Sequence, residues 1–230
     1  MLTTSDCLGR GIYTIAAASR LVCRPADRLR KWVRGYWHVS RGKRIWVPSL
    51  LGTSNGGPYA DSISFADLIE ILHLDHFLTK GVAFRTLRKA SVVASAELHT
   101  VHPFSTHRFR TDGRWILKEH NVDTKHPELY NILTHQLESR KLLRTLLKGE
   151  LELDGHNIAQ RWWPLKKNRD VVVDPTRRFG APISATSGIP THLLFSAYKA
   201  EGSYAAAASW YEVDRGSVID AVAFERMYAA

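Results

Sequence analysis

The chain has 230 residues, of which 44% are hydrophobic and 23% charged, an ordinary composition for a globular protein with a core of its own. Cys7 and Cys23 are too few for a disulfide framework and lack zinc-motif spacing, and no apolar run reaches the ~20 residues of a membrane helix. Together with an N-terminus that lacks the signal-peptide pattern, these features predict a soluble cytoplasmic protein without membrane contact.

The net charge of +10 is concentrated near the N-terminus. Residues 1–60 carry ten Lys or Arg against two Asp or Glu, a net charge of +8, whereas residues 181–230 carry three against five, a net charge of −2. A polyanionic partner is therefore expected to meet the N-terminal segment. The alternative is that the excess charge serves solubility alone.

The first predicted elements are two short helices separated by a tight turn. Thr14 is a suitable N-cap for IAAASRLV, and Pro25 suits the first position of a second helix that Gly35 can end. Leu29, Trp32 and Val33 have the spacing of a buried stripe in that second helix. The layout matches a helix-turn-helix.

Basic residues occupy the face of the second helix that is predicted to point outward. Arg30, Lys31 and Arg34 lie opposite the stripe and Arg28 lies at its flank, an arrangement that suits the major groove of DNA. Next, two short strands at residues 38–39 and 45–47 are expected to form a hairpin, or wing, that grips phosphate or enters the minor groove. The predicted DNA contacts are Arg24, Arg28, Arg30, Lys31, Arg34, Arg41, Lys43 and Arg44. The alternative is a structural helix with a solvated basic face.

The N-terminal part resembles a known family of regulators. YTIAAASRLVCRPADRLRKWVRGY resembles the helix-turn-helix of MerR-type regulators, and ISFADLIEILHLDHFLTKGVAFRTLRKA, after the linker at residues 52–59, resembles the helix pair that follows the wing. Ser64 would cap the first helix of that pair and Gly81 would end it, with the next helix at residues 83–96. The long coiled coil and effector pocket of that family are not visible here.

The middle of the chain is predicted to hold a hairpin, a helix and a second hairpin. Strands at residues 107–111 and 114–118 flank Asp112-Gly113, a strong two-residue turn. From Pro127, ELYNILTHQLESRKLLRTLLK reads as one amphipathic helix, which faces either the core or a partner subunit. A second hairpin is expected around Asp154-Gly155, with Trp162 and Trp163 as packing residues.

The C-terminal segment resembles the small helical family catalogued as "domain of unknown function 433". The residues that carry the resemblance are the Val-rich strand at 171–173, DP at 174–175, FGAP at 179–182, GIP at 188–190 and EGS at 201–203, followed by a helix pair with a helix-turn-helix outline. In that family GTRIP is common, so Gly188 stands where an Arg is usual. Members resemble VapB-type antitoxins, whose partners are toxins with a PIN ribonuclease domain.

The final helix has too few cations to be a second DNA reader. It offers Arg215 and Arg226 against Asp214, Asp220 and Glu225. We therefore expect the C-terminal helices to bind protein or to serve the fold. The PIN resemblance implies a toxin with acidic metal ligands, and Arg177 and Arg178 are candidates to bind it.

We find no pattern that indicates catalysis, a cofactor or a resident metal. His99-x-x-His102, followed by His107, has no Cys or carboxylate partner at a recognised spacing and is interpreted as loop or surface histidines. GxSxG, Walker A, GxGxxG and HExxH patterns are not present in the sequence. The sequence therefore favours a binding protein over an enzyme.

These observations predict a mainly α protein with small β-hairpins. Residues 1–120 would form a MerR-like winged helix-turn-helix, 121–169 a connecting helix and hairpin, and 170–230 an antitoxin-type helical domain. The predicted function is an antitoxin that neutralises a PIN-domain ribonuclease and binds operator DNA as a homodimer, because a single reading helix usually binds a palindrome. The alternatives are a MerR-like transcription regulator without a toxin partner, and an enzyme or ligand-binding module that uses these helices structurally.

Overall fold

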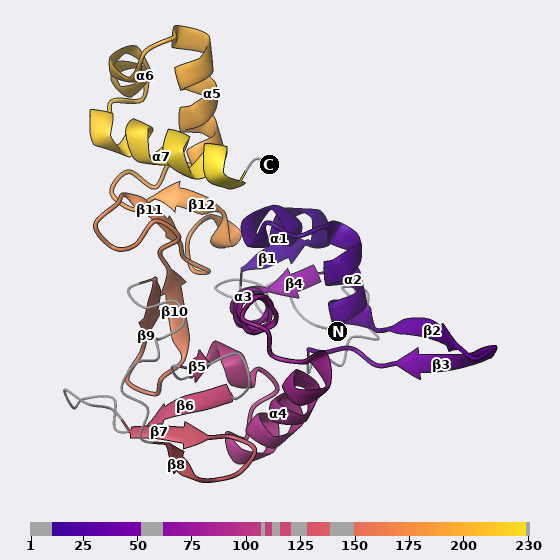
Figure 1. Cartoon of the computed structure of the whole chain (residues 1–230). Helices are drawn as coiled ribbons and strands as arrows, with labels where there is room; N and C mark the ends of the chain where they lie inside the picture. The colour runs from indigo at the N-terminus through magenta and orange to yellow at the C-terminus, as the bar shows by residue number, and fades with distance from the viewer. Residues whose placement is uncertain are drawn as a thin grey trace, which may run out of the picture.

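The computed structural model describes residues 11–51, 62–106, 109–111, 116–120, 128–138 and 150–228. Four antiparallel β-sheets lie in these ranges beside the helices α1 to α7, so the protein has a mixed α and β fold (Figure 1). The expected fold class, mainly α with a winged helix-turn-helix, is therefore wrong. Within the described residues, none of the helices is both long and apolar enough to cross a membrane.

The N-terminal elements follow the sequence pattern closely. They are β1 (Ile12–Thr14), α1 (Ile15–Val22), α2 (Ala26–Arg34), β2 (Tyr36–Ser40) and β3 (Lys43–Val47). The Thr14 hydroxyl caps α1 by accepting a hydrogen bond from the Ala17 amide at 3.0 Å. Leu29, Trp32 and Val33 are buried, as their spacing predicted. These positions of the two helices and the hairpin are confirmed.

The centre of the molecule is α3, a helix that is buried around most of its circumference. This part contains β4 (Ser62–Ser64), α3 (Phe65–Thr79), α4 (Phe84–Glu97) and the short 3₁₀ helix η2 (Pro103–Ser105). The Ser64 hydroxyl accepts from the Asp67 amide, and the Asp67 carboxylate accepts from the Ser64 amide, which forms the capping box that begins α3. Leu68, Ile69 and Leu74 are fully buried, because helices and strands pack against α3 from several sides.

The prediction of a helix from Pro127 is wrong for residues 128–138, and residues 127 and 139–149 lie outside the described part of the chain. A four-stranded sheet stands there instead, formed by β5 (Phe109–Thr111), β6 (Ile116–His120), β7 (Glu128–Asn131) and β8 (Leu137–Glu138). Leu129 and Ile132 are buried, but Leu137 is exposed. Pairing with β6 decided the conformation of this short apolar run, whose spacing also fitted a helix.

A second four-stranded sheet has the order β12-β11-β10-β9. Its strands are β9 (Leu151–Leu153), β10 (Ala159–Trp162), β11 (Val171–Val173) and β12 (Pro182–Ser184), with the short turn η3 (Arg178–Gly180) before β12. The hairpin around Asp154-Gly155 is confirmed by the pairing of β9 with β10. Trp162 is buried in the main core, and the half-buried Trp163 donates its indole N–H to Glu152 at 3.2 Å.

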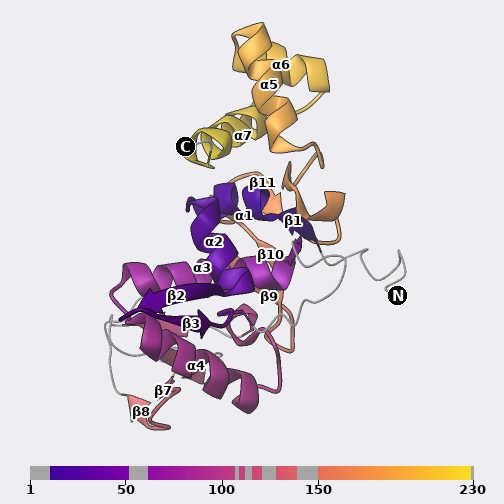
Figure 2. The same ribbon diagram turned by 90° about the vertical axis from the view of Figure 1, so that its right-hand side faces the viewer.

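Three helices form the C-terminal end: α5 (Thr191–Glu201), α6 (Tyr204–Tyr211) and α7 (Arg215–Tyr228). They lie at one end of the molecule, and α4 with the β5–β8 sheet lies at the other (Figures 1 and 2). Leu194, Ala207 and Val218 belong to a small core of their own. Phe224 of α7 instead joins the main core.

The main core explains why α1, α2 and the β2–β3 hairpin are not an independent winged module. Ala18 and Trp32 share one hydrophobic cluster with Leu87 of α4, Phe109 of β5 and Val171 of β11. The apolar faces of the first two helices are therefore buried by elements from the middle and the end of the chain.

Candidate nucleic-acid interface and partner surface

A short turn fixes the angle between α1 and α2. Cys23 has a left-handed backbone with φ of 53°, and its amide donates to the Arg20 carbonyl at 3.1 Å. The Arg24 amide donates to the Ser19 carbonyl at 3.1 Å. Pro25 precedes α2 with φ of −56°, which suits the start of a helix. The packing of Leu29 under this turn then determines which side chains of α2 face outward.

The outward face of α2 is basic. Arg28, Arg30, Lys31 and Arg34 are all exposed, while the stripe on the other side is buried. Arg30 forms an ion pair with Asp27, one turn earlier on the same face. Such an exposed pair contributes little stability, so Arg30 can exchange Asp27 for another anion at small cost.

Arg24 differs from the other predicted contacts. Its side chain turns to α3, where Nε donates to the Asp75 carboxylate and Nη2 donates to the Thr79 hydroxyl at 3.0 Å. The hydrogen bond that Arg24 donates to Asp75 raises the pKa of Arg24 above its ordinary value. The structure thus places Arg24 as a brace between the α1–α2 turn and α3, apart from the exposed basic face.

The β2–β3 hairpin extends from the body of the protein beside α2 (Figure 1). Its two-residue turn, Arg41-Gly42, has φ values of 48° and 75°, as a type I′ turn requires. Arg41, Lys43 and Arg44 are exposed at the tip. The structure therefore brings two predicted groups of cations, on α2 and on the hairpin, into neighbouring elements.

Gly35 allows this close approach of the hairpin to α2. A Cβ atom at Gly35 would lie 2.6 Å from the Val47 carbonyl oxygen, and its φ is +77°. Just after β3, the Leu50 amide donates to the Trp32 carbonyl at 2.8 Å, which ties the returning strand to the end of α2. The hairpin base is thereby held at a fixed position relative to the basic face.

Sequence reasoning missed the aromatic part of the hairpin. Trp37 and Trp46 are 56% and 46% exposed, lie directly across the two strands, and have ring centroids 5.3 Å apart. The Arg44 guanidinium lies 5.0 Å from the Trp37 ring centroid, a cation–π distance. The alternating Trp and basic residues around Arg41-Gly42 are a signal from which this exposed pair could have been found.

More basic side chains surround the groove beside α2. The groove has a volume of about 470 Å³ and is lined by Arg28 and Lys31 of α2, Thr79 of α3 and Phe84 of α4. Exposed cations at the end of α3 and the start of α4 extend the basic surface; they are Lys80, Arg85 and Lys89. These three were not among the predicted contacts, because the sequence does not show that α4 begins beside α2.

The two predicted partner-binding residues, Arg177 and Arg178, have different surroundings. Arg177 is half-buried and donates Nη1 to the Ala185 carbonyl at 3.0 Å, and its Nη2 would lie 3.0 Å from a Cβ at Gly188. Its guanidinium thus lies over the position where the resembled family usually has Arg. Arg178 is exposed in the turn η3, so of the two it has the more accessible side chain.

His102, from the histidine pattern noted in the sequence, packs against acidic side chains of α3. Its Nδ1 lies 3.3 Å from Oε2 of Glu70 and 3.5 Å from Oδ1 of Asp67. Burial raises the pKa of Glu70. Burial alone would lower the pKa of His102, but the hydrogen bond to Glu70 and the negative charges of Asp67 and Glu70 raise the pKa of His102 overall. Within the described ranges, no group of three or more His, Cys, Asp or Glu side chains is placed to hold a metal ion. His107 lies outside those ranges.

Comparisons with known proteins show a likeness in structure. No family model matches the chain, and no curated protein matches it. Among solved structures, the chain is similar to the X-ray crystal structure of Rv2018 from Mycobacterium tuberculosis, with a TM-score of 0.55 and 16% sequence identity. The match covers 91% of this chain and 96% of that chain. At this identity it shows the fold alone, over nearly the full length of both proteins.

Proposed function

We propose that this protein binds double-stranded operator DNA through the exposed face of α2 and the β2–β3 hairpin. The observation that carries the proposal is the fixed placement of two exposed basic groups on neighbouring elements, in the segment that holds most of the net charge. In this account Arg30, Lys31 and Arg34 contact bases and phosphates from α2 in the major groove. Arg41, Lys43 and Arg44 contact the flanking backbone or minor groove.

The arrangement of charges favours a polyanion over a single acidic ligand. Asp27 is the acidic residue within α2, and the hairpin strands carry no Asp or Glu. Contacts to successive phosphates release counterions, so binding of this kind weakens steeply as the salt concentration rises. We propose that a homodimer presents two such surfaces to a palindromic operator.

We further propose that the protein is an antitoxin and that its toxin is a PIN-domain ribonuclease. This part rests on the resemblance of residues 171–228 to antitoxin-associated proteins. It rests also on the absence of net positive charge in α7, where Arg215 and Arg226 are balanced by Asp220 and Glu225, which argues against a second DNA reader. Arg178, exposed in η3, is the residue we propose to meet the toxin's acidic metal ligands. A transcription regulator without a toxin partner is the remaining candidate of the same DNA-binding class.

The two candidates are separated by a pull-down of the full-length protein from its native cell. The antitoxin proposal expects a small ribonuclease to co-purify, and its activity on RNA to be blocked by the intact protein but less by Arg178→Glu. The matched control is Arg215→Glu, which changes the charge of another exposed arginine. If the protein binds DNA but no nuclease co-purifies with it, the antitoxin proposal is refuted and the transcription-regulator proposal remains. Absence of DNA binding would refute the proposal as a whole.

A further inference from the structure

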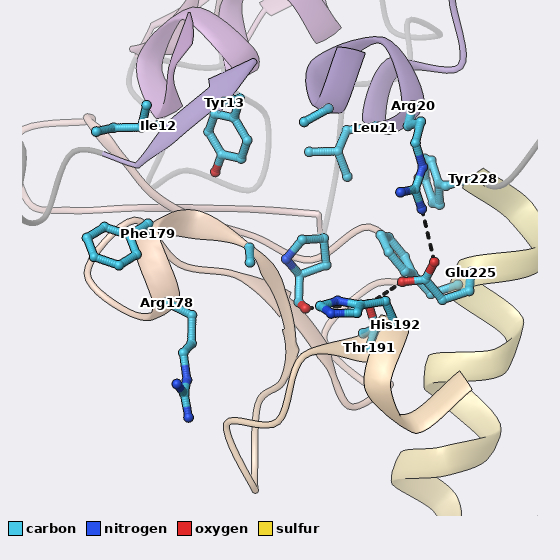
Figure 3. A pocket seen from close by; sticks show the side chains of 14 residues that line it. Ile12, Tyr13, Arg20, Leu21, Arg178, Phe179, Thr191, His192, Glu225 and Tyr228 are labelled. Carbon is cyan, nitrogen blue, oxygen red and sulfur yellow. Dashed lines mark hydrogen bonds and ion pairs between the residues drawn. The ribbon is translucent and has the colours of Figure 1, made fainter. Parts of the chain in front are cut away.

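Residues from the N-terminal and C-terminal parts of the chain line a common cavity. It has a volume of about 230 Å³ and lies between β1 and α1 on one side, and η3, the start of α5 and the end of α7 on the other (Figure 3). The residues that line it come from segments about 160 to 210 residues apart in the sequence, and ligand pockets commonly form where separate parts of a fold meet. None of the predicted DNA contacts lines it, but Arg178 does.

The wall formed by η3 has an unusual backbone. Arg178, Phe179 and Gly180 have consecutive φ values of 48°, 56° and 80°. A left-handed conformation costs about 1–2 kcal/mol for each residue other than glycine. The Tyr13 hydroxyl donates to the Gly180 carbonyl at 2.8 Å, and a Cβ at Gly180 would lie 2.2 Å from that hydroxyl oxygen. The turn is thus tied to β1, and it keeps Phe179, which is 63% exposed, at the rim.

The polar groups of the cavity are unequally satisfied. Glu225 is 5% exposed, and its carboxylate accepts from the Thr191 hydroxyl at 2.6 Å and from Arg20 Nη2 at 3.1 Å (Figure 3). Within the described part of the chain, the side chains of Arg178 and His192 form no hydrogen bond or ion pair. Arg20 neutralises Glu225, the one carboxylate of the lining, which leaves Arg178 as a further cation at the rim, with its guanidinium pointing away from Glu225 (Figure 3). The charge balance of the lining favours an anion.

The rest of the lining is apolar and aromatic. Tyr13, Leu21, Phe224 and Tyr228 lie around the space between α1 and α7. Burial raises the pKa of Tyr228 to about 12, so this hydroxyl stays neutral and the wall carries no negative charge of its own. An apolar cavity of ~150 Å³ is large enough for benzene, so the present one has room for a single ring with a short side chain.

We propose that this cavity binds a small aromatic monocarboxylate. The ring would lie against the aromatic and aliphatic wall, and the carboxylate would lie at the rim, where His192 offers a donor. The exposed Arg178 side chain, which points outward from η3 in Figure 3, would turn toward the carboxylate. Binding here does not depend on the proposed function. However, α1 carries Ala17, Arg20 and Leu21 in the lining and packs directly on α2, so the site lies one helix away from the proposed DNA contacts.

The test uses three probes that share one ring and differ in charge: 3-phenylpropionate, 3-phenylpropanamide and 3-phenylpropylamine. Titration calorimetry with the full-length protein is expected to show one site for the acid, weaker binding of the amide and no binding of the amine. Arg178→Gln is expected to reduce the affinity for the acid to that for the amide, while Arg215→Gln leaves both unchanged.

A second pair of variants tests the location. Ala17→Phe places a ring inside the cavity, whereas Ala16→Phe places the same ring on the exposed face of the same helix. The acid is expected to bind at least about tenfold more weakly to Ala17→Phe, a loss of about 1.4 kcal/mol, and equally to Ala16→Phe and the unmodified protein. Circular dichroism checks that each variant is folded.

Three results would overturn the proposal: no binding of any probe, equal binding of acid and amide, or equal binding of the acid to both phenylalanine variants. All titrations are made without DNA. Failure of ligand binding therefore leaves the DNA-binding proposal intact, and failure of DNA binding leaves this one intact.

Discussion

Replacement of Arg30, Lys31 and Arg34 by alanine removes three charges from the face of α2 without disturbing its buried side. All three side chains are exposed, and alanine is the best helix former, so the variant is expected to fold with unchanged thermal stability within about 1 kcal/mol. Any loss of DNA affinity then reports on contacts to DNA.

The magnitude follows from the number of exposed cations in the proposed interface. These are Arg28, Arg30, Lys31, Arg34, Arg41, Lys43 and Arg44. If each contacts one phosphate, the logarithm of the association constant falls with the logarithm of salt concentration with a slope of about −6, and with a slope of about −4 for the triple variant. Between 50 and 200 mM salt, the affinity of the unmodified protein should then fall by about 10⁴-fold and that of the variant by about 10²-fold.

The assay is fluorescence anisotropy with an operator selected from random duplexes, repeated at several salt concentrations. A matched variant, Lys166→Ala, Lys199→Ala and Arg215→Ala, removes the same charge from exposed positions elsewhere in the chain. It is expected to keep both the slope and nearly all of the affinity. Equal slopes for the two triple variants would refute the assignment of α2 as the DNA-contacting element and would favour a structural role for its basic face.

Three further predictions concern stability. Gly180→Ala should lower the free energy of unfolding by about 2–4 kcal/mol in urea denaturation, because left-handed backbone strain adds to the loss of the buried hydrogen bond from Tyr13. In the control Gly202→Ala the new Cβ meets no atom within 4 Å, so this change should cost about 1 kcal/mol. Equal costs for the two variants would contradict the steric clash at Gly180. Burial lowers the pKa of His73 from 6.5 to about 4, so the folded protein binds a proton at this position less readily than the unfolded chain does. The free energy of unfolding should therefore fall by about 3 kcal/mol as the pH is lowered from above 6.5 toward 4. His73→Phe should lose about 3 kcal/mol less over the same interval, and parallel pH curves for the two proteins would refute this. Ser64→Ala removes the cap of α3 and should cost about 1 kcal/mol in the same denaturation, and an unchanged midpoint would show that the capping box contributes nothing.

Local chemistry made the N-terminal half predictable. Thr14 and Ser64 cap helices through their hydroxyls, and Pro25 favours a helix start through its fixed φ. The first residues of α1, α2 and α3 can therefore be predicted from the sequence to within about one residue. The position of the β2–β3 hairpin was predicted as well, but its strands are longer than expected and its turn is the two residues Arg41-Gly42, where the sequence suggested a loop from residue 40 to residue 44. These signals act over four residues or fewer and do not depend on the rest of the fold.

Long-range packing decided the parts that the sequence did not predict. The run that contains Leu129 and Ile132 has helical spacing, but it pairs with β6 as a strand, and this changed the fold class. The cavity between α1 and α7 depends on Tyr13 reaching Gly180 and on Arg20 reaching Glu225, 167 and 205 residues away. No local pattern marks such a pair, whereas the exposed cations of α2 followed directly from helical periodicity.

The most direct test of the DNA-binding account is site-specific photocrosslinking. A benzophenone amino acid is placed at position 31 on the outward face of α2, and in a second protein at position 199 on α5, both of which are exposed lysines. The selected operator is added to each protein and irradiated. The account predicts a crosslink to DNA bases from position 31 and none from position 199. Strong binding without a crosslink from position 31 would contradict it.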